Sequence, residues 1–522
     1  MKNALVVIPA IKKNAIIPDQ LVKKLNGKTL IQRAIDIAKK ITSNILVITD
    51  SEEIGLICER NGIDFYKEKT LFIDSTNIIE ITLRIIQKRD EEEIIIYRAN
   101  APLVDEIILK NAYHCFLNDK SAILISVKKL DKQLLHFQND HLIKIDDDYF
   151  KELKAFLIFH KRYKKKQIPF VIENEKSIEI ESYQDWWVCE KLLQRKRVVF
   201  HVIGNTQVGM GHIYRALSLA HEITDHEIIF VCDNKDELAV EKIASKDYKV
   251  IPSSNVQQTL LKLHPNLLIN DTLNTTKAFI KPLKEKGIKV VSFEDLGDGC
   301  KYADIVFNEL YDTPILEYKN ILWGHKYYFL RDEFESAKTN NFRKKVQKIL
   351  VTFGGTDQHN LTLMTLKNII EIIQDIKVEV VCGEGYLHKT ILEQFIKEHQ
   401  EKNIDITFKT GIISQKMEEC DFAITSNGRT VYELAHMHIP SLVISQHLRE
   451  KTHEFSKLEN GFINIGLISD ATIEENIQKY TLKMMYDSEY RYLLFLNTLQ
   501  FNFLQNKKKV LQKIIALIEN GV

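Results

Sequence analysis

An apolar run, a glycine turn and a helical pattern follow one another directly near the middle of the chain, and this succession constrains the fold more than any other stretch. The apolar run at residues 198–203 predicts a buried strand, and the pattern of residues 214–222 predicts an amphipathic helix. The turn between them contains Gly209, Gly211 and His212. Glycine lets a backbone approach a ligand closely, and a helix N-terminus favours negative charge. The stretch therefore predicts an α/β sheet with an anion site at the end of one strand, and a histidine beside that site.

This turn departs from two common phosphate-binding motifs. A P-loop carries lysine and then serine or threonine after its second glycine, where this chain has Met210 and Gly211. A dinucleotide fingerprint needs a third glycine where Tyr214 stands, although Asp233 follows the next apolar run at about the distance of a ribose-binding carboxylate. A dinucleotide site therefore remains an alternative, as does a histidine that only caps the helix.

Length and composition exclude several classes of protein. A chain of 522 residues is too long for one core and predicts about three domains. The net charge of +1 indicates no nucleic-acid partner and no membrane-surface role. Seven cysteines without a Cys-x-x-Cys pair predict reduced thiols in a cytoplasmic protein, without disulfides or a zinc site. The chain begins with a strand pattern instead of a signal peptide, and no apolar run approaches the ~20 residues of a membrane span.

Short apolar runs alternate with helical patterns from the start, so residues 1–194 predict one α/β domain with a mostly parallel sheet and helices on both faces. The expected strands are residues 4–8, 45–49, 94–97 and 122–127. The expected helices are residues 30–41, 52–61, 78–88 and 185–193.

Four short motifs mark this first domain: Ile8-Pro9-Ala10, Leu25-Asn26-Gly27-Lys28, Thr49-Asp50-Ser51-Glu52-Glu53 and Ala101-Pro102-Leu103. In this order and spacing they resemble the CMP-sialic acid synthetase (acylneuraminate cytidylyltransferase) family. The resemblance implies a nucleotidyltransferase-like, Rossmann-type domain whose substrates would be CTP and a sialic-acid-like sugar, and whose product would be a CMP-sugar.

The nucleotide loop of that family, Ile-Pro-Ala-Arg-Gly-Gly-Ser-Lys, is altered in this chain. The arginine is replaced by Ile11, the glycines by Lys12 and Lys13, and the lysine by Ala15, while a second family lysine appears as Gln20. A triphosphate needs close backbone approach and cations, and long side chains at glycine positions obstruct that approach. We therefore expect a degenerate cytidylyltransferase-like domain.

Two further features of this domain each have two interpretations. Glu179 and Glu181 alternate with isoleucines, so a strand would place both carboxylates on one face. The family has metal-binding aspartates in a similar segment, so the pair could hold Mg²⁺ if the domain is active; a solvated strand edge is the alternative. A basic cluster at residues 160–166 could dock an anion, although a solvated loop is favoured.

Residues 195–340 repeat the strand–helix alternation and predict one Rossmann-like half. Its expected strands are residues 198–203, 227–232, 249–251, 267–270, 289–293 and 305–308, with a helix at 275–286 that stops at Gly287. Polar residues follow these strands where open α/β sheets bind ligands, at Gly204-Asn205-Thr206, Asn270-Asp271-Thr272 and residues 294–298.

The pattern Gly209-Met210-Gly211-His212-Ile213-Tyr214-Arg215 resembles the first loop of the UDP-sugar hydrolase of pseudaminic acid biosynthesis, an enzyme of the spore-coat polysaccharide biosynthesis type. Residues 294–296 and 303–306 resemble the same family. The resemblance implies the GT-B fold of nucleotide-sugar glycosyltransferases, in which two Rossmann-like halves close on a UDP-sugar.

Residues 345–522, beyond a polar linker at 336–343, predict the second half of such a fold, with a final helix at 510–518 that crosses back. Gly354-Gly355-Thr356-Asp357 matches the turn that opens this half in the hydrolase family. A strand then leads through Asn427 and Gly428 into a helix whose N-terminus can accept a diphosphate. Thr430 adds a hydroxyl donor, and Glu433 can accept two hydrogen bonds from ribose.

The resemblance implies hydrolysis of a UDP-linked modified hexosamine at its anomeric carbon, with release of UDP, in surface-glycan or nonulosonic acid biosynthesis. His212 would act as general base or orient the water, and Arg215 would steady its surroundings. His447, an asparagine in the family, would face the sugar. The nucleotide would be held by Gly209, Gly211, Gly355, Thr356, Asn427, Gly428, Thr430 and Glu433. This module would require no cofactor.

Three alternatives remain open. A glycosyltransferase on the same fold would use a sugar hydroxyl in place of water. The first domain could be a working CMP-nonulosonate cytidylyltransferase. The chain could also be a non-catalytic nucleotide-sugar sensor. The sequence identifies neither the sugar nor the oligomeric state.

Overall fold

The computed structural model describes residues 1, 3–12, 16–68, 77–130, 134–138, 141–145, 149–164, 166–205 and 207–519, with the side chains of 134–138 and 141–145 left aside. Lys13, Ala15 and Thr206, named above, lie outside this set, as does Lys165 of the basic cluster at 160–166. The chain divides into unit 1, Met1–Arg195, and unit 2, Lys196–Val522. The division lies one residue beyond the boundary expected from the sequence.

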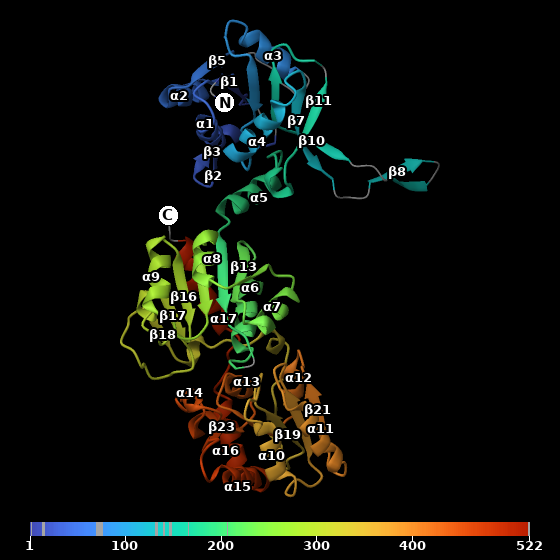
Figure 1. Cartoon of the computed structure of the whole chain (residues 1–522), viewed down its shortest axis with the longest axis vertical. Coiled ribbons are helices and arrows are strands. Elements are labelled where there is room, and N and C mark those ends of the chain that lie inside the picture. The colour runs from blue at the N-terminus through green and yellow to red at the C-terminus, as the bar shows by residue number, and fades with distance from the viewer. Residues whose placement is uncertain are drawn as a thin grey trace. The chain divides into compact units, whose positions relative to one another are not determined.

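Unit 1 is built on a seven-stranded sheet in the order β11-β7-β10-β6-β1-β4-β5 (Figure 1). All neighbours are parallel except β10, which runs antiparallel to β6 and β7. Its strands are β1 (Ala4–Ala10), β4 (Ile45–Thr49), β5 (Asp64–Lys67), β6 (Glu93–Tyr97), β7 (Ile123–Lys129), β10 (Phe150–His160) and β11 (Gln167–Val171). Two short pairs stand apart from it, β2 (Lys24–Leu25) with β3 (Lys28–Thr29), and β8 (Leu134–Gln138) with β9 (His141–Ile145).

Helices cover both faces of this sheet because its central strands are apolar on both sides. They are α1 (Leu30–Lys39), α2 (Glu52–Asn61), α3 (Ile78–Ile85), α4 (Glu106–Phe116) and α5 (Tyr183–Gln194). Val6 and Ile8 of β1 pack with α1, α2, α4 and α5, and Leu5 and Val7 pack with α3. The α/β class and the mostly parallel sheet expected from the sequence are confirmed, and the antiparallel strand β10 is a feature that the sequence did not indicate.

The first lobe of unit 2 has a fully parallel sheet in the order β14-β13-β12-β15-β16-β17-β18. Its strands are β12 (Arg197–Val202), β13 (Glu227–Asp233), β14 (Val250–Ser253), β15 (Leu267–Asp271), β16 (Lys289–Phe293), β17 (Ile305–Asn308) and β18 (Ile321–Trp323). In chain order this sequence of neighbours begins 3-2-1-4-5-6, which is the Rossmann order. One face is covered by α6 (Gly211–Glu222) and α7 (Glu237–Ala244), and the other by α8 (Val256–Leu263) and α9 (Lys277–Glu285).

The second lobe repeats the same order in six parallel strands, β21-β20-β19-β22-β23-β24. They are β19 (Lys348–Thr352), β20 (Lys377–Cys382), β21 (Ile404–Phe408), β22 (Phe422–Ser426), β23 (Ser441–Ser445) and β24 (Phe462–Leu467). The helices are α10 (Leu361–Ile369), α11 (Lys389–Glu398), α12 (Ile413–Met417), α13 (Thr430–His436), α14 (Leu448–Lys451), α15 (Ile473–Tyr486) and α16 (Ser488–Thr498). Two Rossmann-type sheets in one unit give the GT-B arrangement that the resemblance implied.

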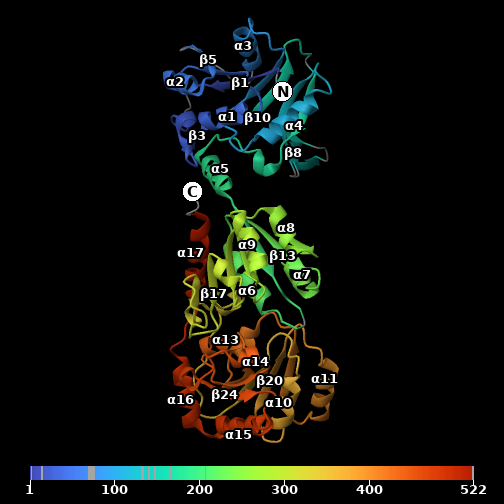
Figure 2. The same ribbon diagram turned by 60° about the vertical axis from the view of Figure 1, so that its left-hand side comes forward.

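The last helix, α17 (Asn506–Glu519), leaves the second lobe and joins the first. Its residues Val510, Ile514 and Ile518 are buried in the core that also holds Val198 and Phe200 of β12. Both cartoon views draw this helix in red beside the sheet of the first lobe of unit 2 (Figures 1 and 2). The expected crossing of the final helix is therefore confirmed, and the first lobe comprises β12–β18, α6–α9 and α17.

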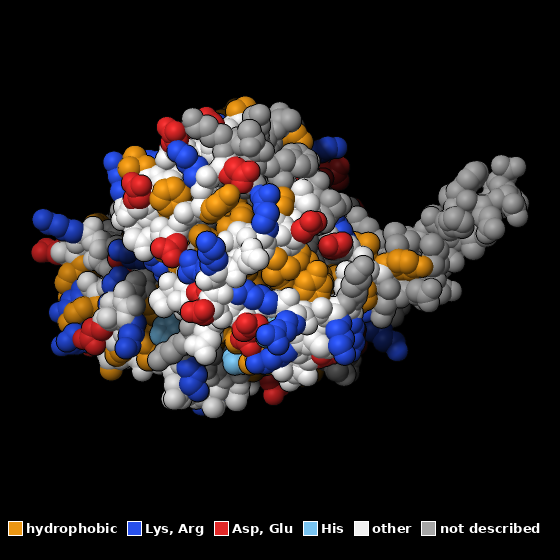
Figure 3. Space-filling model, turned by 90° about the horizontal axis from the view of Figure 1, so that it is seen from above, with side chains coloured by type: hydrophobic (Ala, Val, Ile, Leu, Met, Phe, Trp, Pro, Cys, Tyr) orange, Lys and Arg blue, Asp and Glu red, His pale blue; other side chains and the backbone are white. Residues whose placement is uncertain are grey.

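Charged side chains of both signs are interspersed on the face drawn in Figure 3, in keeping with a net charge of +1. Within the part of the chain that the structure describes, no helix combines the length and the apolar character that crossing a membrane requires.

Candidate active site

A cleft of about 370 Å³ lies between the two lobes of unit 2, within the range of small-molecule sites. Its walls include the turn that follows β12, the carboxyl end of β19 and the turn beyond β19. These are the switch points of the two sheets, where open α/β sheets bind ligands. Of the unit 2 residues predicted for catalysis or nucleotide binding, all except Asn427 line this cleft: Gly209, Gly211, His212, Arg215, Gly355, Thr356, Gly428, Thr430, Glu433 and His447.

Glycines in the turns after β12 and β19 line the cleft and also allow the two lobes to approach closely. Gly209 has φ of +84°, a left-handed backbone that favours glycine. A Cβ on Gly355 would lie 3.3 Å from the backbone nitrogen of Met210, and one on Gly211 would lie 3.4 Å from Cδ of Arg429. A side chain at Gly355 would crowd the backbone of the opposite lobe, and one at Gly211 would contact the Arg429 side chain.

His212 is held by a carboxylate at the end of the neighbouring strand. Helix α6 begins at Gly211, three residues earlier than expected, which makes His212 and Arg215 one helical turn apart on the same face. Both reach Asp271, the last residue of β15, and the distance from His212 Nδ1 to Asp271 Oδ1 is 2.6 Å. The ring does not cap the helix, whose N-cap residue Met210 has no side-chain cap bond.

The contacts of His212 define its tautomer. Burial alone would raise the pKa of Asp271, but the charge of Arg215 and the hydrogen bonds from Arg215 and His212 lower the pKa, so Asp271 is ionised and can only accept. Nδ1 therefore carries the proton and donates it to Asp271. Arg215 Nη2 lies 3.1 Å from the same nitrogen, a close approach of two donors and not a second bond. Nε2, on the opposite side of a ring that lines the cleft, keeps its lone pair.

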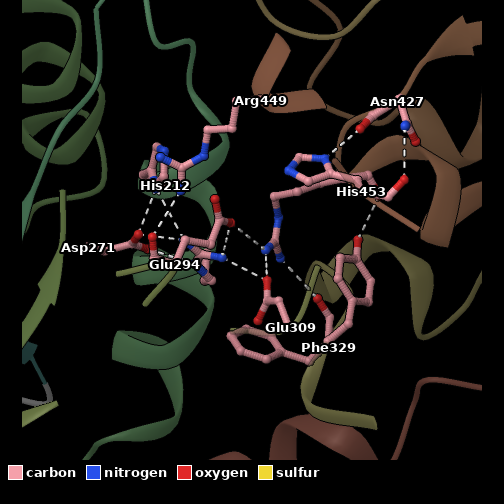
Figure 4. Close-up of polar contacts among 11 residues, drawn as sticks. His212, Asp271, Glu294, Glu309, Phe329, Asn427, Arg449 and His453 are labelled. Carbon is pink, nitrogen blue, oxygen red and sulfur yellow. Dashed lines mark hydrogen bonds and ion pairs between the residues drawn. The ribbon is translucent and has the colours of Figure 1, made fainter. Parts of the chain in front are cut away.

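Arg215 is fully buried and forms ion pairs with three carboxylates at the ends of successive strands. These are Asp271, Glu294 and Glu309, which are labelled in Figure 4. The Nε of Arg215 lies 2.7 Å from Asp271, and its Nη1 lies 2.6 Å from Glu294 and 2.7 Å from Glu309. Burial would raise the pKa of Glu294, yet the charge of Arg215 lowers it well below its ordinary value. These pairings offset the desolvation of each charge.

A second arginine joins this network from the opposite lobe. Arg429, at the N-cap of α13, donates to Glu309 and also lies 3.7 Å from Glu294. Burial and the nearby charge of Arg215 lower the pKa of Arg429 to about 10, so it stays charged at neutral pH. Guanidinium groups from both lobes thus contact the carboxylates at the ends of these strands.

The second lobe places the predicted nucleotide residues at one end of the cleft. Glu433 is buried, and its Oε1 accepts a hydrogen bond of 2.9 Å from Nε of Arg331 in the connection between the lobes. Arg331 also lies over the ring of Tyr214, which lines the cleft from α6. Gly428 and Thr430 lie in the turn before Glu433. The sequence pattern indicated Glu433 and gave no sign of its arginine partner.

Asn427 corrects one prediction. Its side chain is completely buried and turned away from the cleft, with Nδ2 donating to the carbonyls of Glu450 (2.7 Å) and His453 (3.2 Å). Its Oδ1 accepts from Ser456 Oγ at 2.7 Å. All of these bonds hold the segment that follows β23 against the end of β22, so Asn427 is an anchor of the cleft wall.

His447 lines the cleft but also has a local role. It is the N-cap of α14, where its Nδ1 accepts from the backbone N–H of Glu450 at 3.3 Å. Burial, helped by the charges of Arg449 and His359, lowers the pKa of His447, so the ring is neutral at pH 7. Nε2 then carries a proton that can be donated to a ligand.

Three cleft residues of the same segment were missed from the sequence. Arg449 donates from Nη2 to the backbone carbonyl of Glu294 at 2.9 Å and lies on the His212 side of the site (Figure 4). His453 donates from Nδ1 to the carbonyl of Asn427 at 2.7 Å, and its buried Nε2 has no hydrogen-bond partner among the described residues. Glu450 is buried in the cleft wall, and burial raises its pKa to about 7.

In unit 1 the predicted pair Glu179 and Glu181 does not lie on one face of a strand. Residues 178–181 are outside any strand, because the Ile180 backbone is bonded to Asn100 (2.8 Å) and to the Gln20 side chain (2.6 Å). Glu179 is consequently buried, and burial together with the charge of Glu181 raises its pKa, while Glu181 is exposed. Among the described residues, no group of three or more His, Cys, Asp or Glu side chains is placed to hold a metal ion.

The altered nucleotide loop of unit 1 is described only as far as Lys12. The Lys12 side chain forms ion pairs with Glu53 (2.8 Å) and Asp19 (3.2 Å), and its backbone N–H donates to Asp50 (2.8 Å). Local carboxylates therefore already satisfy the one lysine that the structure describes in this loop.

Unit 1 is similar to known cytidylyltransferases. Residues 6–184 match the cytidylyltransferase family model. The pseudaminic acid cytidylyltransferase of Campylobacter jejuni is 26% identical over 164 residues, 29% of this chain and 70% of that protein.

Two further relatives are similar over longer stretches. An uncharacterized protein of Methanocaldococcus jannaschii is 30% identical over 263 residues, 47% of this chain, which spans about half (54%) of that relative. The UDP-2,4-diacetamido-2,4,6-trideoxy-β-L-altropyranose hydrolase of Campylobacter jejuni is 27% identical over 248 residues, 45% of this chain and 87% of that protein. Both alignments are longer than unit 1 and so extend into unit 2.

Proposed function

We propose that unit 2 binds a UDP-linked modified hexosamine in the inter-lobe cleft and hydrolyses it at the anomeric carbon, releasing UDP. The observation that carries the proposal is the Asp271–His212 pair, which leaves a basic imidazole nitrogen toward the cleft. The pair resembles the orienting carboxylate and base of other hydrolytic sites, where the carboxylate sets the tautomer and steadies the imidazolium.

In the proposed reaction, water attacks the anomeric carbon while the bond from that carbon to the diphosphate oxygen breaks. His212 Nε2 takes one proton of the attacking water, and the bonding electron pair leaves with UDP. Asp271 accepts a hydrogen bond from the imidazole, and its negative charge favours the imidazolium that forms at the moment of attack.

The nucleotide would lie against the second lobe, with its diphosphate at Gly428 and Thr430 and its ribose hydroxyls at Glu433. Gly355 and Thr356 form the facing turn of the same lobe. Arg331 fixes Glu433 through Oε1, which would leave its other oxygen for ribose. His447 would meet the sugar or the leaving oxygen through Nε2. The Campylobacter jejuni hydrolase supports this choice of substrate class, because 87% of its length aligns with this chain.

The test is release of UDP from a panel of UDP-hexosamines that includes the sugar nucleotide named for that relative. Because the base contributes about 10²–10⁴-fold, His212→Ala should lose that much rate and still bind UDP within a few-fold of the wild type. His221→Ala is the matched control, since His221 lies on the same helix, is 42% exposed and pairs with Asp332. Unchanged turnover in His212→Ala, or no UDP binding by the wild type, would remove the proposal.

The same experiment separates hydrolysis from transfer. Release that requires an added sugar acceptor would assign the chain to the glycosyltransferases, since a hydroxyl can replace water at the same base. UDP binding that survives in His212→Ala, with no turnover by either protein, would indicate a sensor.

The family match of residues 6–184 favours a second activity, transfer of CMP from CTP to a nonulosonic acid by unit 1. The ion pairs of Lys12 argue against it, because they occupy a cation that the loop would offer to phosphate. We propose that unit 1 is inactive in this transfer. Pyrophosphate release from CTP plus a nonulosonic acid would overturn that view.

A further inference from the structure

Glu450 lines the cleft but has no role in the reaction proposed above. It belongs to α14 on the second lobe, and its side chain is 8% exposed. Its Oε2 accepts from the backbone N–H of Gln446 at 2.7 Å. Its Oε1 lies 3.6 Å from the place that a Cβ on Gly428 would occupy. The carboxyl group therefore sits directly over the turn proposed to hold the diphosphate.

No cation accompanies this carboxyl group. Among the described residues, no Lys, Arg or His side chain forms an ion pair within 4.0 Å of the Glu450 carboxylate oxygens, whereas Glu294 and Glu309 each contact arginine. Only the backbone amides of Gln446 and Asn427 favour its ionised form. A buried carboxylate without a partner is costly, so the neutral acid is preferred.

The groups around Glu450 do not supply the missing charge. On its own segment, His447 precedes it and His453 follows it, and burial lowers the pKa of both rings, so both are neutral at pH 7. The turn packed against it from β22 contributes Asn427 and Gly428, which do not titrate. The two nearest arginines are directed elsewhere: Arg449 donates to the backbone carbonyl of Glu294, and Arg429 pairs with Glu309. An ionised Glu450 would also repel a diphosphate bound at that turn, whereas a neutral one can donate to it.

We propose that Glu450, in its protonated form, donates a hydrogen bond to the diphosphate and passes its proton to the leaving oxygen. The inference rests on the proposed function. The bond from the anomeric carbon to the diphosphate oxygen breaks and its electron pair stays with that oxygen, which receives the Glu450 proton. Water forms the new bond to carbon and gives its proton to His212. The imidazolium and the Glu450 carboxylate then exchange one proton through solvent, which restores the starting state.

The first test measures UDP affinity between pH 6 and pH 8.5 in the wild type and in Glu450→Gln. The wild type must retain one proton to bind, so its Kd should rise at least about tenfold more over this range than that of the variant. UDP itself titrates near pH 6, and this effect is common to both proteins and cancels. Glu454→Gln, an exposed position outside the cleft, is the matched control and should follow the wild type.

A second measurement needs no variant. Calorimetry of UDP binding at pH 8 in buffers of different ionisation enthalpy should show uptake of up to one proton by the wild-type protein. Absence of uptake, or equal pH dependence in wild type and Glu450→Gln, would overturn the proposal. Lack of UDP binding by the wild type at any pH would instead refute the proposed function itself, on which the inference depends.

The final readout concerns proton transfer, on whichever UDP-sugar the wild type hydrolyses. We expect kcat of the wild type to fall at alkaline pH, and Glu450→Gln to lose both this alkaline limb and about 10²-fold in kcat. A variant that binds UDP with altered pH dependence but retains full kcat would show that Glu450 contacts the diphosphate without donating its proton.

Discussion

Glu450 makes a prediction about stability that requires no ligand. Its pKa is about 7 in the folded protein and 4.5 in an exposed carboxyl. The unfolded chain therefore releases this proton near pH 4.5, and the folded chain only near pH 7. Between these values the folded state binds more protons, so raising the pH favours unfolding. Each tenfold change in proton affinity is worth about 1.4 kcal/mol, which gives about 3 kcal/mol for the complete interval.

Glu450→Gln removes this titration while keeping the size of the side chain and an oxygen that can accept from Gln446. At pH 5 the wild type and the variant should be of nearly equal stability. At pH 8 the variant should be more stable by about 3 kcal/mol, or roughly 5 °C in the melting temperature of the transition that reports unit 2. Thermal denaturation of the full chain at several pH values, with Glu454→Gln as control, measures the difference. Equal pH dependence in the two proteins would contradict the unpaired burial of Glu450.

Other residues give predictions of different kinds. Asp271→Asn should lower UDP release by about 10²–10⁴-fold, because an amide can donate to Nδ1 and favour the wrong tautomer, and because it lacks the charge that stabilises the imidazolium; single-turnover kinetics with a UDP-binding control would show this. Arg429→Met should destabilise the protein by about 3–5 kcal/mol, seen as a lower melting temperature, because Glu309 keeps only one cation; an unchanged melting temperature would argue against the inter-lobe network. Glu433→Ala should weaken UDP binding about tenfold or more in calorimetry, and unaltered affinity would place ribose elsewhere.

Much of the fold was predictable because local pattern and tertiary packing agree in these segments. The expected helix at 52–61 coincides with α2, whose N-cap Ser51 and C-cap Gly62 are both visible in the sequence. The expected strands of the first lobe match β12–β17 to within a few residues, since apolar runs of this length fit buried parallel strands. The carboxylates of Asp271 and Glu294 followed from the rule that ligands gather where such strands end.

Other features could not be predicted because they depend on contacts between distant segments. Alternation suggested a strand at Glu179, but bonds of Ile180 to Asn100 and Gln20 fix that segment differently. Asparagine before a glycine at the end of a strand is a common ligand-binding residue type. Only the fold shows that the Asn427 side chain forms its hydrogen bonds with Glu450, His453 and Ser456 instead. Glu309 follows β17 just as Asp271 ends β15, so the same rule would have found it had it been applied to every strand.

The chain passes between the lobes of unit 2 twice, once before β19 and once before α17. These passages touch, because Asn506 Nδ2, at the start of α17, donates to the carbonyl of Tyr328 at 2.8 Å and to that of His325 at 3.3 Å. Two connecting segments that lie side by side would favour rotation of the lobes about an axis near them over twisting or sliding. Opening by such a rotation would move the turn at Gly209 away from the turn at Gly355, which are close together in this structure.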